Sequence, residues 1–586
     1  MSSSSQRELV FSEGHKDHED HRPSGTVQDG HDIKPPADKQ PAGHGWRFWA
    51  VFISLSISAF LSALEGAVVS TALPSISRAV NAGQDYIWMV NVFFLTSLVL
   101  TLQYSAAVQP CYGQLADIWG RRWPTITALG IFALGSGIAG AATSSSMLIG
   151  GRTIQGIGAA GINVLVEIII CDLLPLRERG QYMGLMFVFI VLGSVCGPLL
   201  GGILVDRVSW RWVFYLNLPL CALCLVLLLL FLRVKRPNSG QSTKESLKTV
   251  DFLGLFMLCG AISSLLFALT YGGTRYNWSD ARIIVSFLMG MAGLALFLGY
   301  QVSPVCPHPA MPKALFNNRT SVAALLATFM QLMTSFVPLY FLPVYFQAVQ
   351  RVSPSRSGVQ ILPFSATFCV SGLFGGILVS KLGRFKAVHI VSFAIQIISL
   401  GTFTLLDRNS TMAVWVILQL IYGWSLGMPN PSLLTAIQAD IPDSLNAAST
   451  GAFAFVRSVA TIFAVSVPAA VFGNRFDQLL ATTDMVRDPA AWGALAKGLA
   501  YERASRDFIN SFPHDIQDGI ISLYELSLKR VWYVSMAFAG AGFVFVLLEK
   551  NLVTRDVKEA SEFELQDPAD QRDGNGVKES QGRGKL

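Results

Sequence analysis

Two long apolar segments of this chain are separated by the ten residues Gly113-Gln-Leu-Ala-Asp117-Ile-Trp-Gly120-Arg121-Arg122. Glycine lets the backbone reverse sharply and lets helices approach closely. Asp117 can accept hydrogen bonds from a helix N-terminus or pair with an arginine, and the two arginines hold such a turn on the positively charged side of a bilayer. The stretch predicts a tight turn between two membrane helices, with a plain topology anchor as the alternative role.

The composition places the chain in a membrane. Of 586 residues, 52% are hydrophobic and 14% are charged, and the mean hydropathy is +0.47, which leaves too little charged surface for a soluble protein of this size. The net charge of +6 includes no polybasic domain and argues against nucleic acid as a partner. Cys221 and Cys224 are spaced CxxC in a leucine-rich run without flanking ligands, so we interpret them as packing residues, not as a redox or metal site.

Fourteen apolar runs are long enough to cross about 30 Å of hydrocarbon. An even number of spans brings both termini to one side, where the short loops carry fourteen Lys and Arg, against eight on the opposite side. We therefore expect cytoplasmic termini in a multi-pass protein of the cell membrane, with the vacuolar membrane as the alternative. The predicted spans cover residues 47–73, 87–112, 123–142, 147–173, 182–204, 213–232, 251–271, 282–301, 321–346, 358–381, 387–406, 412–437, 451–473 and 531–549.

Polar segments flank and interrupt these spans. Residues 1–45 are rich in Ser, His, Asp, Lys, Pro and Gly and cannot bury enough apolar area to offset their ordering entropy, so we expect a disordered tail. The sequons at Asn277 and Asn409 fall in loops that the topology places outside, which predicts glycosylation, whereas Asn318 falls inside and should be silent. The segment 474–530 is predicted to be a long external loop.

One carboxylate, Glu65, stands in the otherwise apolar first span, where an ionised side chain costs on the order of 3 kcal/mol. It lies some 18 residues along its helix, or about 27 Å at 1.5 Å per residue, and Arg152 lies about one turn inside the outer boundary of the fourth span. The two should sit at similar depth. We predict that Arg152 approaches Glu65 and that protonation of the carboxylate releases Arg152 or its neighbour Gln155. A permanent helix-packing contact is the alternative.

Two more acidic residues follow on the fourth span. Glu167 is the second candidate for contact with a proton or cation. Asp172 lies close to Arg177 and Arg179, so we interpret it as part of an interfacial ion pair.

The fifth span carries glycines at every fourth position. Gly193, Gly197 and Gly201 form a smooth stripe that lets a neighbouring helix come close. Pro198 removes a backbone donor and favours a bend. A packing groove explains the stripe, and stripe, proline and Gly202 together indicate a hinge.

In the later spans, Arg457 is the clearest buried cation, and Gly427-Met-Pro429-Asn430-Pro431 interrupts the twelfth span. Broken helices at membrane depth are tolerated where backbone lines a cavity, so this segment is predicted to border a substrate path or gate. Aromatic side chains could line the same path or face lipid and neighbouring helices. These are Phe341, Tyr345, Phe346, Tyr422 and Trp424.

Four stretches together resemble the motif set of the major facilitator superfamily, and most closely its fourteen-span drug:proton antiporter branch with the fungal toxin-efflux members. They are the turn at 113–122, Arg-x-x-Gln-Gly at 152–156, Gly-Pro-x-x-Gly-Gly at 197–202 and Ala-Leu-Pro ending at 74. The resemblance covers about residues 46–550. It implies an all-α membrane fold of two six-helix bundles with two inserted helices, alternating access, and antiport associated with the Gly-Pro stripe.

Under this resemblance the chain divides into six parts: a tail (1–45), a first bundle (46–232), a cytoplasmic linker (233–250), two inserted helices (251–301), a second bundle (302–549) that includes the external loop 474–530, and a C-terminal tail (550–586). Glu65 departs from the family, which more often has Asp at this position. The second span also looks about two turns longer than usual.

The leading hypothesis is a secondary exporter that exchanges small amphipathic molecules for protons. No phosphate-binding Gly-x-x-x-x-Gly-Lys-Ser/Thr loop occurs, so ATP hydrolysis is not expected, and neither is a cofactor, a metal or an obligate protein partner. A proton-coupled importer, such as a siderophore transporter, is the nearest alternative. A polytopic membrane enzyme is disfavoured because His389 is the only histidine in a predicted span. A non-transporting membrane sensor is disfavoured by the short tails.

Overall fold

The computed structural model of the protein describes residues 45–101, 120–174, 176–232, 252–304, 306, 313–439, 441, 446–483, 486, 488–496 and 498–552. The regular structure in these ranges is helical, and no extended strand occurs among the described residues. The predicted all-α membrane fold is confirmed. Gly113, Asp117, the end of the predicted second span, the linker 233–250 and nearly all of both tails lie outside the described residues.

The first half of the chain folds into helices that correspond to the first six predicted spans. They are α1 (Trp46–Ala79), α2 (Tyr86–Thr101), α4 (Arg122–Gly140), α5 (Ser145–Leu173), α6 (Leu176–Arg207), and α7 (Trp212–Tyr215) followed by α8 (Asn217–Phe231). A 3-10 turn, η1 (Gly83–Asp85), joins α1 to α2. The inserted pair is α10 (Phe252–Tyr271) and α11 (Ala281–Val302).

The second half begins with α12 (Lys313–Phe316) and contains the remaining six predicted spans. Their helices are α13 (Arg319–Val344) with the π-helical turn η2 (Tyr345–Val349), α14 (Pro354–Leu382), α15 (Lys386–Phe403), α16 (Met412–Gly427) followed by α17 (Asn430–Gln438), α18 (Asn446–Thr482) and α21 (His514–Leu547). Two short helices, α19 (Pro489–Leu495) and α20 (Arg506–Ile509), lie between α18 and α21.

Among the described residues, twelve helices are long and apolar enough to cross a membrane. Two shorter apolar helices, Tyr86–Ser97 and Phe256–Tyr271, stand at the second and seventh predicted spans. Each predicted span therefore falls on a helix, and the count of fourteen crossings stays a prediction.

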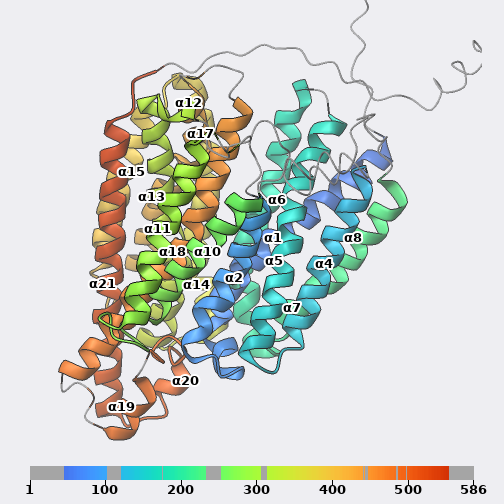
Figure 1. The fold of residues 1–586 in the computed structure, drawn as a ribbon. Helices are drawn as coiled ribbons and strands as arrows, with labels where there is room; N and C mark the ends of the chain where they lie inside the picture. The colour runs from blue at the N-terminus through green and yellow to red at the C-terminus, as the bar shows by residue number, and fades with distance from the viewer. Residues whose placement is uncertain are drawn as a thin grey trace, which may run out of the picture. The chain divides into compact units, whose positions relative to one another are not determined.

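Helix pairs within each half pack along their lengths. In the first half α1 lies against α6, and α5 lies between α4 and α2; in the second half α14 packs on α16, and α21 contacts α13 and α15. Between the halves, α6 packs on α14, α2 packs on α18, and α1 contacts α13 and α14. Helix α10 contacts both α2 and α18 (Figure 1). The result is two helical bundles with the inserted pair at their junction.

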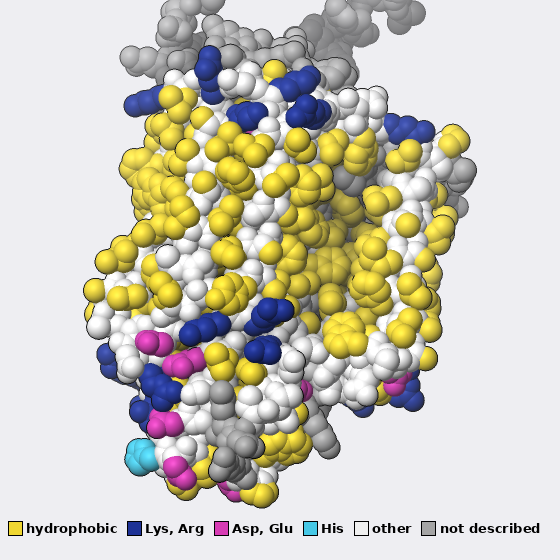
Figure 2. Space-filling view, turned by 90° about the vertical axis from the view of Figure 1, so that its left-hand side faces the viewer, with side chains coloured by type: hydrophobic (Ala, Val, Ile, Leu, Met, Phe, Trp, Pro, Cys, Tyr) yellow, Lys and Arg dark blue, Asp and Glu magenta, His cyan; other side chains and the backbone are white. Residues whose placement is uncertain are grey.

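We name the two ends of the bundles by the chain. The near end is where α1 begins and α21 ends, at the top of Figure 1, and the far end is where α1 ends and α21 begins. On the face drawn in Figure 2, Lys and Arg gather at the near end, hydrophobic side chains cover the middle, and acidic and basic side chains mix toward the far end. A wide apolar surface bounded by charged ends is typical of a protein that spans a bilayer.

The predicted loop 474–530 is wrong in its extent. Helix α18 continues to Thr482 and α21 begins at His514, so only residues 483–513 separate the two helices. The extensions remain helical because their apolar faces bury each other. Phe476, Leu480, Ile520 and Tyr524 all belong to one hydrophobic core.

The glycine stripe of α6 sets the distance to α1. A methyl group on Gly193 would lie 2.4 Å from the carbonyl oxygen of Phe60, and one on Gly201 would lie 2.2 Å from that of Val68. One on Gly197 would lie 2.6 Å from a side-chain carbon of α1. The two backbones are therefore closer than any larger residue allows, which accounts for the stripe by packing.

The residues after the stripe join the two halves. A methyl group on Gly202 would lie 2.3 Å from the carbonyl oxygen of Pro354 at the start of α14, and one on Gly358 would lie 2.5 Å from that of Pro198. The Pro198 carbonyl also accepts a hydrogen bond from Thr71 Oγ1 at 2.8 Å. Pro198 lies inside α6 as one continuous helix, so its role as a hinge stays a prediction.

The two halves contact each other at the far end, whereas polar side chains of α5 are exposed toward the near end. Gln347 Nε2 of η2 donates to the carbonyl oxygen of Thr71 in α1 at 3.4 Å. Toward the near end, Asn163 and Glu167 lie one turn apart on α5 and are exposed, although most of this helix is buried. The arrangement is closed at the far end.

Candidate functional site

The structure brings Glu65 and Arg152 together in the buried core of the first half. Glu65 is 0% and Arg152 1% exposed, and Arg152 Nη1 donates to Glu65 Oε1. This is the contact that equal depth on α1 and α5 predicts. A buried charge without a partner is costly, so the position of each side chain depends on the other.

Neutral side chains complete the site. Asn217 Nδ2 of α8 donates to Glu65 Oε2 at 2.6 Å and lies 3.3 Å from Ser136 Oγ of α4. Gln155 accepts from Arg152 Nη1 at 2.9 Å and donates to the same Ser136 Oγ at 2.8 Å. One chain of hydrogen bonds thus ties four helices of the first half to a single ion pair.

Arg152 has two further contacts that do not depend on Glu65. Its Nε donates to the carbonyl oxygen of Met89 at 3.1 Å, and its guanidinium lies over the ring of Phe93 at 4.4 Å. Both partners belong to α2. The arginine can therefore remain held when the carboxylate becomes neutral.

Glycines place α5 against its neighbours so that these side chains meet. A methyl group on Gly135 of α4 would lie 2.4 Å from the backbone nitrogen of Gln155, and one on Gly156 would lie 2.0 Å from Thr96 Oγ1 of α2. Gly156 is the last residue of the Arg-x-x-Gln-Gly stretch. The stretch therefore supplies both the polar groups and the close helix contact that buries them.

The second half reaches the site through one residue. Tyr340 of α13, 2% exposed, places its hydroxyl 3.4 Å from the carbonyl oxygen of Gly66, the neighbour of Glu65. Glu65 is therefore the sequence neighbour of a residue, Gly66, whose carbonyl oxygen contacts the second half. The sequence offered no signal for this partner, because a tyrosine in an apolar run has many possible neighbours.

Glu167, Arg457 and Asn430 form a second polar group between the halves. Arg457 Nη1 of α18 donates to Asn430 Oδ1 of α17 at 3.1 Å, and its guanidinium lies 5.2 Å from the ring centre of Phe453. Glu167 of α5 interacts electrostatically with Arg457. Predicted candidates from both halves therefore face each other, and Glu167 and Asn163 are exposed beside them.

The predicted break of the twelfth span is present, since α16 ends at Gly427 and α17 begins at Asn430. Pro429 has no N–H for the carbonyl oxygen of Ser425, four residues before it. Gln396 Nε2 of α15 donates to that oxygen at 3.2 Å, and Gln331 Nε2 of α13 donates to the next one, of Leu426, at 2.8 Å. Buried amides thus stabilise a broken helix at membrane depth.

The aromatic candidates separate into two groups. Tyr345 is 2% exposed, and its hydroxyl donates to the carbonyl oxygen of Asp407 at 2.8 Å, so it packs in the far-end core. Phe341, Phe346 and Tyr422 are likewise buried. Trp424 is 39% exposed and belongs to a wholly apolar stripe with Ile417, Leu420 and Ile421, which is typical of a lipid-facing surface.

The described part of the turn at 113–122 holds two helix ends. Gly120 has a φ of +80°, which favours glycine. Arg121 Nε donates to Asp172 Oδ2 at the end of α5 at 2.7 Å, and Arg122 donates to the carbonyl oxygen of Leu229 at the end of α8. Asp172 thus pairs with Arg121; the side chains of Arg177 and Arg179, which the sequence indicated, lie outside the described part of the chain.

The second half repeats this arrangement. Gly383, with a φ of +61°, precedes α15 as Gly120 precedes α4. Lys386 Nζ donates to the carbonyl oxygen of Leu547 at the end of α21 at 3.0 Å. In both halves, therefore, a cation at the start of one helix (α4 or α15) binds the C-terminal end of another (α8 or α21), where the helix dipole favours positive charge.

A buried group that the sequence did not predict lies beside this contact. His389 Nδ1 of α15 is 2.9 Å from Glu549 Oε2, and its Nε2 is 2.9 Å from Ser432 Oγ of α17. All three side chains are at most 2% exposed. Glu549, His389 and Ser432 are linked in the same order as the acid, histidine and serine of a hydrolytic triad. All three side chains are buried, so a substrate cannot reach the serine. In the described residues, no three His, Cys, Asp or Glu side chains gather to hold a metal ion.

The two predicted glycosylation sites are exposed in loops at the far end, Asn277 between α10 and α11 and Asn409 between α15 and α16. Asn318 lies at the opposite end, as the N-cap of α13. Modification of Asn277 and Asn409 stays a prediction.

Two helical bundles with a carboxylate–guanidinium pair buried in one of them define a polytopic membrane transporter. The model of the Major Facilitator Superfamily matches residues 55–465, and the chain belongs to this superfamily. The MFS-type efflux transporter pyiT of Pyricularia grisea is 54% identical, covering 91% of this chain and 88% of that protein. The MFS-type efflux transporter ffsH of Aspergillus flavipes is 44% identical, with the same coverage of 91% and 88%.

Solved structures support the fold. A mutant of the nucleoside transporter NupG matches with a TM-score of 0.53 at 13% identity, over 85% of this chain and 100% of that one. A bacterial homologue of the human lysosomal transporter Spinster matches with a TM-score of 0.55 at 16% identity, over 86% and 97%. The resemblance to the superfamily and to fungal efflux members is thus confirmed, and the protein is a multi-pass membrane transporter.

Proposed function

We propose that the protein is a proton-coupled exporter of small amphipathic molecules that works by alternating access. The observation that carries the coupling is the buried pair of Glu65 and Arg152. Efflux is supported by the relatives pyiT and ffsH, which are named efflux transporters. No enzymatic step or obligate protein partner is part of this proposal, and the cytoplasm lies at the near end, where Lys and Arg gather on the face shown in Figure 2.

The proton acts at Glu65. When the carboxyl binds a proton, it no longer attracts Arg152, whereas Gln155, Met89 and Phe93 still hold the guanidinium in place. The charge in the core then changes from a neutral pair to a lone cation. That state is costly in a low dielectric and favours an arrangement in which Arg152 gains water or a new partner.

The neighbouring contact links this change to the halves. Tyr340 bonds the carbonyl oxygen of Gly66, so movement of α1 at Glu65 alters the seam between α1 and α13. At the near end, Glu167 and Arg457 offer a polar route into the space between the halves, and Asn430 lies beside them. Substrate enters by this route, and the broken helix around Pro429 borders it.

The test uses purified protein in liposomes with an imposed pH difference and a panel of fluorescent amphipathic dyes. Glu65→Gln keeps the volume and the bond to Asn217 but cannot change charge. We expect it to lose gradient-driven dye accumulation while it keeps exchange of dye without a gradient. Glu525→Gln is the control, because that carboxylate lies at the far end, away from the core pair.

Full gradient-driven accumulation by Glu65→Gln would contradict the coupling role. The direction of dye movement separates the exporter from a proton-coupled importer. If the wild-type protein moves no dye, with or without the gradient, a non-transporting sensor is favoured.

A further inference from the structure

Residues 498–505, which we name the far-end segment, are fixed to the second half. The segment lies between α19 and α20, beyond the end of α18. Tyr501 O–H donates to the carbonyl oxygen of Tyr340 at 3.0 Å, and Tyr524 O–H donates to that of Ala500. Ala500, Tyr501 and Ala504 are at most 2% exposed. Because the segment is buried and bonded to α13 and α21, it moves with the second half.

One carboxylate of this segment binds the first half. Glu502 is 4% exposed, and its Oε2 accepts a hydrogen bond from the backbone N–H of Gly83 in η1 at 2.8 Å. The guanidinium of Arg503 is 4.0 Å from the same carboxylate. A buried carboxylate loses stability without hydrogen bonds, so the bond to Gly83 ties the two halves together.

Two further contacts reach the first half. The ring of Tyr501 stacks on that of Tyr86 at 4.5 Å between centroids and 9° between planes. Arg78, in the last turn of α1, donates to Ser505 Oγ. Burial raises the pKa of Tyr501 well above its ordinary value, so the hydroxyl remains a neutral donor while its ring packs on α2.

Alternating access requires the halves to separate at the far end. The far-end segment has contacts with both halves, and it cannot keep both when the seam opens. We propose that residues 498–505 are a latch: they close the far end by binding Arg78, Gly83 and Tyr86, and they leave these residues together with the second half at each opening. The inference depends on alternating access and not on the proposed proton coupling.

The first test measures hydrogen–deuterium exchange of the full-length protein in detergent. Glu502→Ala removes the acceptor of Gly83 and changes no residue of the η1 turn itself. We expect exchange of residues 78–86 and 498–505 to rise at least about tenfold, as loss of a hydrogen bond to a charged group implies.

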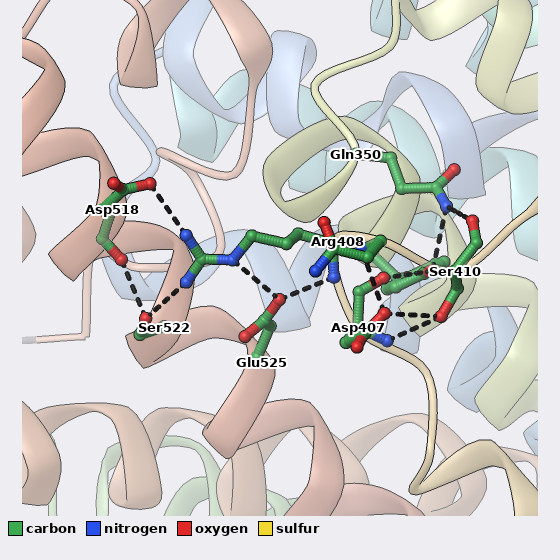
Figure 3. Close-up of polar contacts among 9 residues, drawn as sticks. Gln350, Asp407, Arg408, Ser410, Asp518, Ser522 and Glu525 are labelled. Atoms are coloured by element: carbon green, nitrogen blue, oxygen red, sulfur yellow. Dashed lines mark hydrogen bonds and ion pairs between the residues drawn. The ribbon is translucent and has the colours of Figure 1, made fainter.

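Figure 3 shows the matched control. Glu525 Oε1 accepts from the backbone N–H of Arg408 at 2.7 Å, and Arg408 Nη1 donates to Asp518 Oδ1 at 2.7 Å. This is also a far-end bond between a carboxylate and a backbone N–H, but it lies entirely within the second half. Glu525→Ala should raise exchange near Arg408 and leave residues 78–86 unchanged. Unchanged protection of 78–86 in Glu502→Ala would overturn the latch.

A second test keeps Glu502. Arg78→Cys and Ser505→Cys are joined by a bifunctional maleimide about as long as an arginine side chain, with each single variant as a reagent control. Exchange of residues 66–72 and 340–349, which line the seam, should fall at least about tenfold, because the far end can no longer open. The pair Arg408→Cys and Asp518→Cys, bridged in the same way within one half, should leave the seam unaffected. Equal seam exchange with both bridges would refute the proposal.

Discussion

Removal of Arg152 should destabilise the protein far more than neutralisation of Glu65. Arg152→Met leaves the Glu65 carboxylate in the core without the cation that pairs with it, and only neutral amides, those of Asn217 at 2.6 Å and of Gln155, remain beside it in the described contacts. Breaking a buried pair from one side costs about 3–5 kcal/mol. Glu65→Gln also leaves an unpaired ion, Arg152, but this cation keeps its bonds to Gln155 and Met89 and its contact with the Phe93 ring, so the expected cost is smaller, about 1–3 kcal/mol.

The double variant separates pairing from packing. If the cost of Arg152→Met comes from an uncompensated carboxylate, then Glu65→Gln in the same molecule should remove much of it, with a coupling energy of about 1–3 kcal/mol. If it comes from lost contacts with Phe93, the two costs should add. The free energies are measured by equilibrium unfolding in mixed detergent micelles, with the matched variant Arg211→Met as the control. Arg211 is a partly buried arginine of the same half, and its guanidinium donates to the carbonyl oxygens of Gly140 and Ala142 at the end of α4 and lies over the ring of Trp210.

The pH of the experiment gives an independent check. A protonated carboxyl carries no charge to bury, so the loss in Arg152→Met should shrink as the pH falls, whereas the loss in Glu65→Gln should not depend on pH in this way. The reasoning is refuted if Arg152→Met costs no more than Glu65→Gln, or if the cost of Arg152→Met grows toward acid.

Two other predictions concern packing at membrane depth. Gly201→Ala should cost about 1–3 kcal/mol because the new methyl would lie 2.2 Å from a carbonyl oxygen of α1, whereas Gly184→Ala on the same helix meets nothing within 4 Å and should be neutral in the same unfolding assay. Gln396→Ala should cost about 1–3 kcal/mol by leaving the Ser425 carbonyl without a donor, and Pro429→Ala, which restores a backbone N–H, should reduce that cost; additive losses would contradict this account.

The parts of the fold that follow from local sequence were predictable. Within the described residues, each apolar run forms a helix, because a single segment of this length and hydropathy satisfies its backbone in lipid as a helix. The contact of Glu65 with Arg152 followed from a depth argument on two helices. The break at Pro429 followed from proline chemistry.

Residues whose role depends on helix register were not predictable. Nothing in the sequence distinguishes Asn217 and Ser136 from other polar residues. The packing of α8 brings Asn217 to Glu65, and the packing of α4 brings Ser136 to Asn217. His389 and Glu549 are 160 positions apart and meet only because α21 ends beside the start of α15. The sequence shows amphipathic stretches around residues 476–480 and 520–528, but the continuation of α18 to Thr482 and the start of α21 at His514 escaped prediction, because the apolar faces of these stretches are buried by contacts between distant parts of the chain.

The two halves differ in how they satisfy polar groups at mid-depth, and this difference bears on where the proton acts. The first half uses full charges, in Glu65 and Arg152. The second half holds its broken helix with the uncharged amides of Gln331 and Gln396. Its Arg457, which bonds Asn430, is a cation and accepts no proton, and its buried His389 lies at the near end, at the fourth residue of α15. An amide cannot change its charge, so a proton that enters the core has a charged acceptor there in the first half alone among the described groups. In the proposed cycle, the first half therefore changes its electrostatics, whereas the amides that hold the broken helix of the second half keep theirs.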